Sequence, residues 1–248
     1  MYIVVCLAWV LAPLSPMLVW YTLPMHPQLF KATIQQKLQL TPKTTQLVLH
    51  LVAPAHIDPV PGQFVSLKVS TTAEIFRPYS IVKVSGATTL TLLVATGHDG
   101  LGSNFVNSLK TGDTVWFVGP AGRFHLKQPV SDTLYFFATG TGIAPFISMF
   151  LQLTAQNYLG NVTLFYGIRH REDVLMVHNL DGFKSSLPNF KYELFVSSET
   201  GRVTEALSRI TDLSADFYMC GNPAMVKDIM TALKAKGVSE DRLLAEAF

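Results

Sequence analysis

Residues 138–145, ATGTGIAP, join the end of an apolar run to the start of the next segment. Gly140 and Gly142 would let the backbone approach a pyrophosphate, and a helix that begins there would direct its free N–H groups and positive dipole end toward that anion. Pro145 suits the first turn of such a helix and stands in place of the third glycine of the usual dinucleotide fingerprint. The spacing favours a dinucleotide phosphate site, with a simple tight turn as the alternative.

Residues 76–82, FRPYSIV, carry an arginine, a tyrosine and a serine within an otherwise apolar run. Side chains two apart in a strand share a face, so Arg77 and Tyr79 point one way while Phe76, Pro78 and Ser80 point the other. The fragment alone fits an amphipathic strand whose arginine reaches solvent. A strand that holds a ligand is the alternative, and the rest of the chain has to decide between them.

The third candidate is MCGNPAM, residues 219–225, where Cys220 precedes Gly221 and a helix is expected to start near Pro223. The cysteine therefore lies at the tip of a predicted strand. Taken alone, it is more typical of a small buried hydrophobic residue than of a reactive thiol.

Composition limits the classes of protein that these residues can belong to. The 248 residues are 49% hydrophobic and only 15% charged, which argues against disorder, and a formal charge of +2 does not indicate a nucleic-acid partner. The only cysteines are Cys6 and Cys220, which excludes a disulfide framework, a four-cysteine zinc site and a cysteine-ligated iron-sulfur cluster within this sequence. We predict no metal site of the chain's own.

Residues 1–24 form an apolar segment without a charged residue, and the first lysine is Lys31. This is about the length that a membrane-spanning helix needs, and neither a basic start nor an A-x-A site indicates a secretory signal. The lysines that follow, Lys31 and Lys37, would place the remainder on the cytoplasmic side. The two interpretations that remain open are an anchor to the inner face of the cytoplasmic membrane and a mis-assigned start, with translation beginning at Met25.

The elements that must position the candidate residues fall into two patterns. Residues 29–127 contain short apolar runs broken by turn residues, among them QLVLHLVAP, GQFVSLKV and TLTLLVATG, with one short helix expected over LGSNFVNSL. Residues 131–248 alternate strand with helix four times: TLYFFATG then IAPFISMFLQLTA, NVTLFYGIR then EDVLMVHNLDGF, KYELFVSS then RVTEALSRI, and ADFYMCG then PAMVKDIMTALKAKG. The fold class predicted is an antiparallel β-barrel domain followed by an α/β domain with a doubly wound parallel sheet, whose ligands bind at the carboxyl ends of its strands.

Eight motifs occur in one order along the chain: PGQFVSL, RPYS, GLGSNFV, GDTVWFVGPAGRF, GTGIAP, YGIRHRED, CGNPAM and the terminal EAF. Together they resemble the ferredoxin-NADP reductase superfamily, and the similarity covers residues 29–248. Each motif is weak alone, but their shared order and spacing are specific. The resemblance implies that the barrel binds a flavin, FAD or alternatively FMN, and that the second domain binds NAD(P)H.

The resemblance also implies roles for the residues of the barrel. Arg77 would pair with the flavin phosphate, Tyr79 would pack on the isoalloxazine ring next to Pro78, and Ser80 would hydrogen-bond to N5. The loop that opens the short helix would cradle the same pyrophosphate through its backbone N–H groups, and it comprises Gly102, Ser103 and Asn104.

In the second domain the resemblance implies two groups of residues. Cys220 would lie beside the nicotinamide, Glu246 would carry a proton, and Phe248 would cover the flavin until nicotinamide displaces it. The residues expected around the pyrophosphate and nicotinamide ribose are Thr139, Gly140, Thr141, Gly142, Pro145, Gly221 and Met225.

Coenzyme choice stays open in the sequence. Relatives selective for NADPH commonly carry Ser-Arg after the third strand, where this chain has Ser197, Ser198 and Glu199, with Ser198 in the place of the arginine. Arg169 and Arg202 stand where some relatives contact the adenosine end, so we expect use of both coenzymes with a lean to NADH.

The function implied is an FAD-dependent NAD(P)H oxidoreductase that passes electrons to a separate acceptor protein, such as a ferredoxin, a flavodoxin or an oxygenase component. A reductase of free flavin and a non-catalytic membrane-attached flavin-binding module are the alternatives. We expect a cytoplasmic location, with membrane association through residues 1–24 if that segment is an anchor.

Overall fold

The computed structural model describes residues 28–247. The predictions made for residues 1–24 and for Phe248 lie outside the described residues. Within the described range, no helix is long and apolar enough to cross a membrane, and no cluster of side chains could hold a metal ion.

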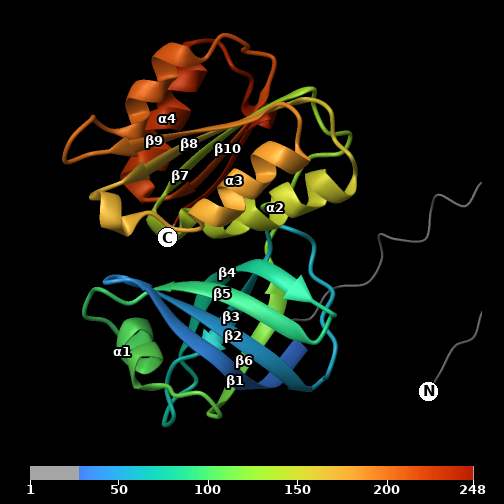
Figure 1. Cartoon of the computed structure of the whole chain (residues 1–248), viewed down its shortest axis with the longest axis vertical. Coiled ribbons are helices and arrows are strands. Elements are labelled where there is room, and N and C mark those ends of the chain that lie inside the picture. Colours follow the sequence, from blue (N-terminus) through green and yellow to red (C-terminus); the bar gives the residue numbers. More distant parts are fainter. Residues whose placement is uncertain (1–27, 248) are drawn as a thin grey trace, which may run out of the picture.

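The first half of the chain is a closed six-stranded antiparallel barrel with the strand order β1-β2-β5-β4-β3-β6 (Figure 1). Its alternating strands direct apolar side chains such as Phe30, Leu49 and Phe117 into one core. One short helix, α1, follows β5 and packs against the barrel. The elements are β1 (Gln28–Thr41), β2 (Thr44–Ala53), β3 (Phe64–Lys68), β4 (Phe76–Ser85), β5 (Thr89–Ala95), α1 (Leu101–Ser108) and β6 (Thr114–Ala121).

The second half is a five-stranded parallel sheet with the order β11-β10-β7-β8-β9. The strands are β7 (Thr133–Thr139), β8 (Asn161–Ile168), β9 (Phe190–Val196), β10 (Asp216–Gly221) and β11 (Leu243–Ala247). The helices that connect them are α2 (Ala144–Ala155), α3 (Val177–Ser186) and α4 (Pro223–Ala235), with short 3₁₀ helices η1 (Gly140–Ile143), η2 (Arg171–Asp173), η3 (Val203–Arg209) and η4 (Glu240–Arg242).

Helices cover both faces of this sheet. One core contains Phe146 and Phe150 of α2 and Leu180 of α3, and the other contains Ala206 of η3 and Ile229 of α4. The central strands β7 and β10 are buried on both faces, which explains their near-continuous apolar sequences. This arrangement confirms the predicted fold class.

Helix α2 also joins the two domains. Val82 of β4 and Leu93 of β5 belong to the same buried cluster as the α2 side chains, and the backbone N–H of Gly62 donates to Ser148 Oγ on α2 at 2.9 Å. The barrel therefore shares an apolar core with helix α2, which Figure 1 shows between the barrel and the parallel sheet. This contact fixes β4 and β5 next to the sheet.

Several elements differ from the sequence prediction. The predicted count of four strands was wrong, because β11 pairs in parallel with β10 as a fifth strand. The five residues LLAEA are too short and too poor in β-branched residues to signal a strand. The helix predicted over RVTEALSRI is the 3₁₀ helix η3. The helix predicted from Glu172 begins only at Val177, after Met176 adopts a positive φ of 61°.

Candidate functional site

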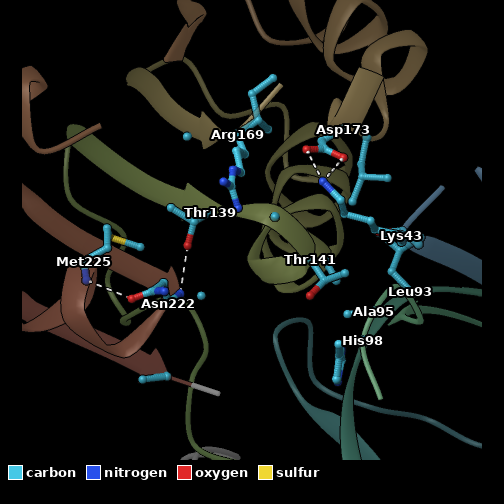
Figure 2. Close-up of a pocket in the computed structure, with 18 of the residues that line it drawn as sticks. Lys43, Leu93, Ala95, His98, Thr139, Thr141, Arg169, Asp173, Asn222 and Met225 are labelled. Carbon is cyan, nitrogen blue, oxygen red and sulfur yellow. Dashed lines mark hydrogen bonds and ion pairs between the residues drawn. The ribbon is translucent and has the colours of Figure 1, made fainter. Parts of the chain in front are cut away.

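A cavity of ≈ 1570 Å³ lies between the barrel and the carboxyl ends of the parallel strands. Pockets for one small molecule usually measure about 300–1,000 Å³, so this cavity has room for more than one. Fourteen of the predicted site residues line it: Arg77, Pro78, Tyr79, Ser80, Gly102, Ser103, Thr139, Gly140, Thr141, Arg169, Arg202, Gly221, Met225 and Glu246. Figure 2 labels Thr139, Thr141, Arg169 and Met225 among them, together with other lining residues that the barrel contributes, Lys43, Leu93, Ala95 and His98.

Strand β4 supplies three neighbouring polar side chains to the barrel wall. Arg77 is exposed, and its Nη1 donates to the backbone oxygen of Phe76 at 2.9 Å. Tyr79 is half-buried, and burial raises the pKa of its hydroxyl while the nearby Arg77 charge lowers it. Ser80 is 6% exposed. Because no ion pair within residues 28–247 engages Arg77, its guanidinium can pair with an anion in the cavity.

The first turn of α1 lies against the same part of the wall. A Cβ added to Gly102 would fall 2.4 Å from Tyr79 Oη, so a larger residue there would displace the Tyr79 side chain. The first turn carries no acidic residue and no side-chain cap, which leaves its N–H groups free for an anion. Ser103 Oγ donates to the backbone oxygen of Ala95 at 3.0 Å. Asn104 does not line the cavity, which differs from its prediction: its backbone N–H donates to the backbone oxygen of Gly100 at 2.8 Å, and its side-chain amide donates to Asp99 Oδ1 at 2.8 Å.

Gly140 and Gly142, the two glycines predicted to contact pyrophosphate, have different surroundings in the turn after β7. Gly140 has φ +53°, and a Cβ there would meet nothing within 4 Å, so its backbone faces open space. A Cβ at Gly142 would lie 2.2 Å from the backbone oxygen of Cys220, so this glycine is needed for packing against β10. Pro145 is buried in the first turn of α2. Neither Gly142 nor Pro145 lines the cavity, which differs from the predicted contact with pyrophosphate.

The tip of β10 is locked to the tip of β7. The backbone N–H of Asn222 donates to Thr139 Oγ1 at 2.8 Å. As the N-cap of α4, Asn222 Oδ1 accepts from Ala224 N at 2.9 Å and from Met225 N at 3.4 Å, and Figure 2 shows the contacts with Thr139 and Met225. Gly221 has φ +127°, and a Cβ there would lie 2.3 Å from Thr139 Oγ1. These contacts leave Met225 and Gly221 in the cavity wall.

Ser80, Cys220 and Glu246 come together where the two domains meet. Ser80 Oγ donates to Glu246 Oε1 at 3.4 Å, and Cys220 of β10 pairs in register with Glu246 of β11. Burial raises the pKa of Glu246, which the Ser80 hydrogen bond partly offsets. The group combines a hydroxyl that can donate with a carboxyl that can carry a proton.

Cys220 differs from its prediction in one respect. Its side chain is fully buried and does not line the cavity. Burial and the neighbouring Glu246 raise the pKa of its thiol well above the usual value. Cys220 is therefore a neutral group beneath the cavity wall.

The other end of the cavity lies at the tips of β8 and β9, where Arg169 and Arg202 line it. Ser198 is exposed and does not line the cavity, whereas its neighbour Ser197 does. The serine that lines this end of the cavity is therefore Ser197 and not the predicted Ser198.

Several lining residues escaped the sequence analysis. Lys43 reaches from the barrel to Asp173 of η2, with 3.1 Å between Nζ and Oδ2 (Figure 2). Their positions, 130 residues apart, give no local signal. Asn222 could have been found, since an asparagine before Pro223 is typical of a helix N-cap.

The residues present fit two dinucleotides. Two helix N-termini without acidic residues, those of α1 and of η1 with α2, open on one cavity, and each follows a glycine-containing turn. Arg77 stands at the first, and the open backbone of Gly140 at the second. The barrel end thus suits the phosphate of FAD and the sheet end that of NAD(P)H.

Two family models match the chain. One, described as Oxidoreductase FAD-binding domain, matches residues 31–126. The other, described as Oxidoreductase NAD-binding domain, matches residues 136–231. Together they cover the barrel and most of the parallel-sheet domain.

Curated relatives cover the same range. The chain is 31% identical over 198 residues to the toluate 1,2-dioxygenase electron transfer component of Pseudomonas putida, across 76% of this chain and 58% of that protein. It is 31% identical over 214 residues to the 2-halobenzoate 1,2-dioxygenase electron transfer component of Burkholderia cepacia, across 82% of this chain and 62% of that protein. The chain thus spans about three fifths of the length of these relatives.

Solved structures share the fold. An Amycolatopsis cytochrome P450 reductase, GcoB, superposes with a TM-score of 0.82 at 23% identity, covering 90% of this chain and 70% of that chain. The ferredoxin-NADP+ reductase of Plasmodium falciparum has a TM-score of 0.77 at 24% identity, covering 92% and 98%. With the FAD-binding barrel, the NAD-binding sheet and their shared cavity, the chain belongs to the ferredoxin-NADP reductase superfamily.

Proposed function

We propose that this protein is a reductase that takes a hydride from NAD(P)H and passes electrons, one at a time, to a separate acceptor protein. The observation that carries the proposal is the single cavity that joins the FAD end, marked by Arg77, to the NAD(P)H end, marked by Gly140, with Ser80 and Glu246 in its wall. Bound FAD would supply the chemistry, because a flavin accepts a hydride and releases single electrons.

The residues of the chain would orient and protonate. The proposed role of Arg77 and the α1 N-terminus is to hold the FAD pyrophosphate, so that the ring lies against Tyr79 and Ser80. The Ser80 hydroxyl would hydrogen-bond to N5, and Glu246, within hydrogen-bond distance of Ser80 at 3.4 Å, would deliver or remove the accompanying proton. The proposed role of the buried Cys220 is to support the wall beside the nicotinamide.

We propose an oxygenase component, or a ferredoxin that serves one, as the acceptor. The support is that the two curated relatives described above are named electron transfer components of dioxygenases. A flavodoxin, which is also a separate electron-acceptor protein, is an alternative in this proposal. The sequence contains two cysteines, too few for a four-cysteine iron-sulfur centre, so the one-electron carrier would be a separate protein or domain.

The acceptor experiment separates this proposal from free-flavin reduction. Purified protein loaded with FAD is mixed with NADH or NADPH and with a plant-type or oxygenase-type ferredoxin, and cytochrome c reduction is followed. The proposal predicts that cytochrome c reduction rises in proportion to added ferredoxin. Activity that responds to added free flavin and never to ferredoxin would instead identify a free-flavin reductase.

We also propose FAD as the flavin, with FMN as the alternative, and use of both coenzymes with a lean to NADH. Chromatography of the flavin released from heat-treated protein distinguishes FAD from FMN. Membrane attachment through residues 1–24, with the domains in the cytoplasm, rests on the uncharged composition of that segment. Sedimentation of the full chain with membranes tests it.

A further inference from the structure

The tips of β8 and β9 carry an ion pair at the rim of the cavity, outside the residues that line it. Arg171 and Glu199 are joined by two contacts, from Nη2 to Oε2 at 2.7 Å and from Nε to Oε2 at 2.8 Å. Both side chains are partly exposed, at 69% and 41% respectively. The guanidinium therefore presents two donors to one carboxylate oxygen.

The backbone places this pair beside the NAD(P)H end. Arg171 follows Arg169 by two positions and Glu199 follows Ser197 by two positions, and both Arg169 and Ser197 line the cavity. The Ser198 N–H donates to the backbone oxygen of Arg169 at 3.2 Å, which ties the two tips together. The turn after β9 holds Glu199 in place, because its N–H donates to the backbone oxygen of Val196 at 2.8 Å.

Two arginines, Arg169 and Arg202, line this end of the cavity and Arg171 lies two positions from the first, and the three differ in whether a carboxylate pairs with the guanidinium. The guanidinium groups of Arg169 and Arg202 form no ion pair within residues 28–247, although the backbone N–H of Arg202 donates to Glu205 Oε1 at 3.0 Å. Arg171 is engaged by Glu199. In α/β dinucleotide domains, an acidic residue near a strand tip favours the 2′-hydroxyl of NADH, while an arginine there binds the 2′-phosphate of NADPH.

We infer that Glu199 is a coenzyme-selectivity residue that acts by occupying Arg171. While Arg171 is paired with Glu199, its guanidinium is not available to the 2′-phosphate of NADPH. The negative charge of Glu199 also repels that phosphate. The inference deepens the proposed function, since it assumes that NAD(P)H binds with its adenosine end at the tips of β8 and β9. The free Arg169 and Arg202 leave some affinity for NADPH, so Glu199 lowers the preference for NADPH without abolishing its use.

The test is binding of 2′-phospho-AMP and of AMP to the FAD-loaded protein by isothermal titration calorimetry. Glu199→Gln removes the negative charge, keeps the size and frees Arg171. We expect its affinity for 2′-phospho-AMP to rise about three- to tenfold, the range of one charge-assisted contact reduced by solvent screening, with AMP affinity unchanged. The ratio of kcat/KM for NADPH to that for NADH should rise by the same factor.

Variants of Arg171 show whether the effect passes through this side chain. Arg171→Gln in the wild-type background should not raise 2′-phospho-AMP affinity and should lower it, because it leaves the Glu199 charge, which opposes the anion, without its partner. In the Glu199→Gln/Arg171→Gln double variant the gain should disappear. The matched control is Glu240→Gln, which removes another exposed Glu in an ion pair, with Lys234 at 2.7 Å, on a segment that does not line the cavity.

Two results would overturn the inference: unchanged 2′-phospho-AMP affinity in Glu199→Gln, or a gain that persists in the double variant. The binding measurement needs no turnover. Wild-type protein whose flavin neither coenzyme reduces would contradict the proposed function, and the affinities of the variants would still decide the role of Glu199.

Discussion

On strand β4, Arg77 and Ser80 are proposed to have distinct roles. Arg77 is exposed in the cavity wall without an ion-pair partner in the described chain, whereas Ser80 is buried and hydrogen-bonded to Glu246. The exposed guanidinium of Arg77 suits the binding of an anion, and the hydroxyl of Ser80 suits a hydrogen bond that positions a proton on Glu246. This division leads to different expectations for the two alanine variants.

Arg77→Ala should weaken flavin retention, because it removes a charge-assisted phosphate contact worth about 1.5–3 kcal/mol. Ser80→Ala should keep its flavin and slow hydride transfer. Flavin content after gel filtration and the rate of anaerobic reduction measure the two effects separately. Equal flavin loss in both variants would show that these roles are assigned incorrectly.

Glu246 should give the reaction a pH dependence. Burial raises its pKa, so the carboxyl stays protonated to a higher pH than an exposed glutamate and can donate over that range. We expect the pH profile of flavin reduction or reoxidation to show an ionisation above the ordinary glutamate range, and Glu246→Gln to remove it. A profile that Glu246→Gln leaves unchanged would exclude Glu246 as the proton carrier.

The same shift makes a linked prediction about stability. Because the folded-state pKa lies above the unfolded value, the folded protein holds the proton more tightly, and the stability contributed by the protonated carboxyl is lost as pH rises through the folded pKa. Glu246→Gln should flatten this part of the curve of unfolding free energy against pH. Denaturant unfolding at several pH values would measure it, and an equally steep curve in the variant would contradict the assignment.

Sequence patterns found the site residues that act through local motifs. Arg77, Ser80 and Gly140 stand in short runs whose spacing has a physical reason, and all three line the cavity. The Lys43–Asp173 pair could not be predicted, since it depends on how two domains meet. Gly142 was predicted to contact phosphate, but the structure shows that it packs against Cys220. A glycine required for close backbone packing and a glycine required for ligand binding cannot be distinguished in the sequence.

At the scale of elements, the turn between β7 and α2 depends on close packing. A Cβ at Gly142 would collide with the backbone oxygen of Cys220 at 2.2 Å, and neither backbone can move easily within the parallel sheet. Gly182 in α3 is the opposite case, because a Cβ there would meet nothing within 4 Å.

Gly142→Ala should therefore destabilise the protein by about 1–3 kcal/mol, the usual cost of overpacking. Gly182→Ala should stabilise it by up to about 1 kcal/mol, because alanine is the better helix former. Denaturant unfolding of both variants gives the comparison. Similar stability changes in the two variants would mean that the contact between η1 and β10 is not tight.

The elements that the sequence predicted are long apolar runs bounded by turn residues. β7 and β10 are near-continuous apolar runs, and α2 is a long apolar helix that follows the glycine turn. β1 and β11 were not among the predicted runs, because β1 has mixed exposure along its fourteen residues and β11 has five residues. Backbone pairing of β1 with β6 and of β11 with β10 stabilises these two strands, although their own sequences carry only a weak strand signal.

At the scale of the whole molecule, every residue described in the cavity wall lies at Lys43 or beyond. Removal of residues 1–24 should therefore leave flavin content and NAD(P)H-dependent dye reduction unchanged. Loss of flavin on truncation would show that this segment contributes to the fold or the site. Comparison of the two forms in a membrane sedimentation assay decides whether the segment anchors the protein.

The central claim is that one cavity brings FAD and NAD(P)H together so that hydride passes between them. The most direct test is the visible absorbance spectrum of the FAD-loaded protein, recorded without oxygen before and after addition of one equivalent of NADH or NADPH. We predict a bound oxidised flavin whose absorbance bleaches on addition and returns when an electron acceptor is admitted. A protein that retains no FAD after reconstitution, or bound FAD that both coenzymes leave oxidised, would contradict the claim.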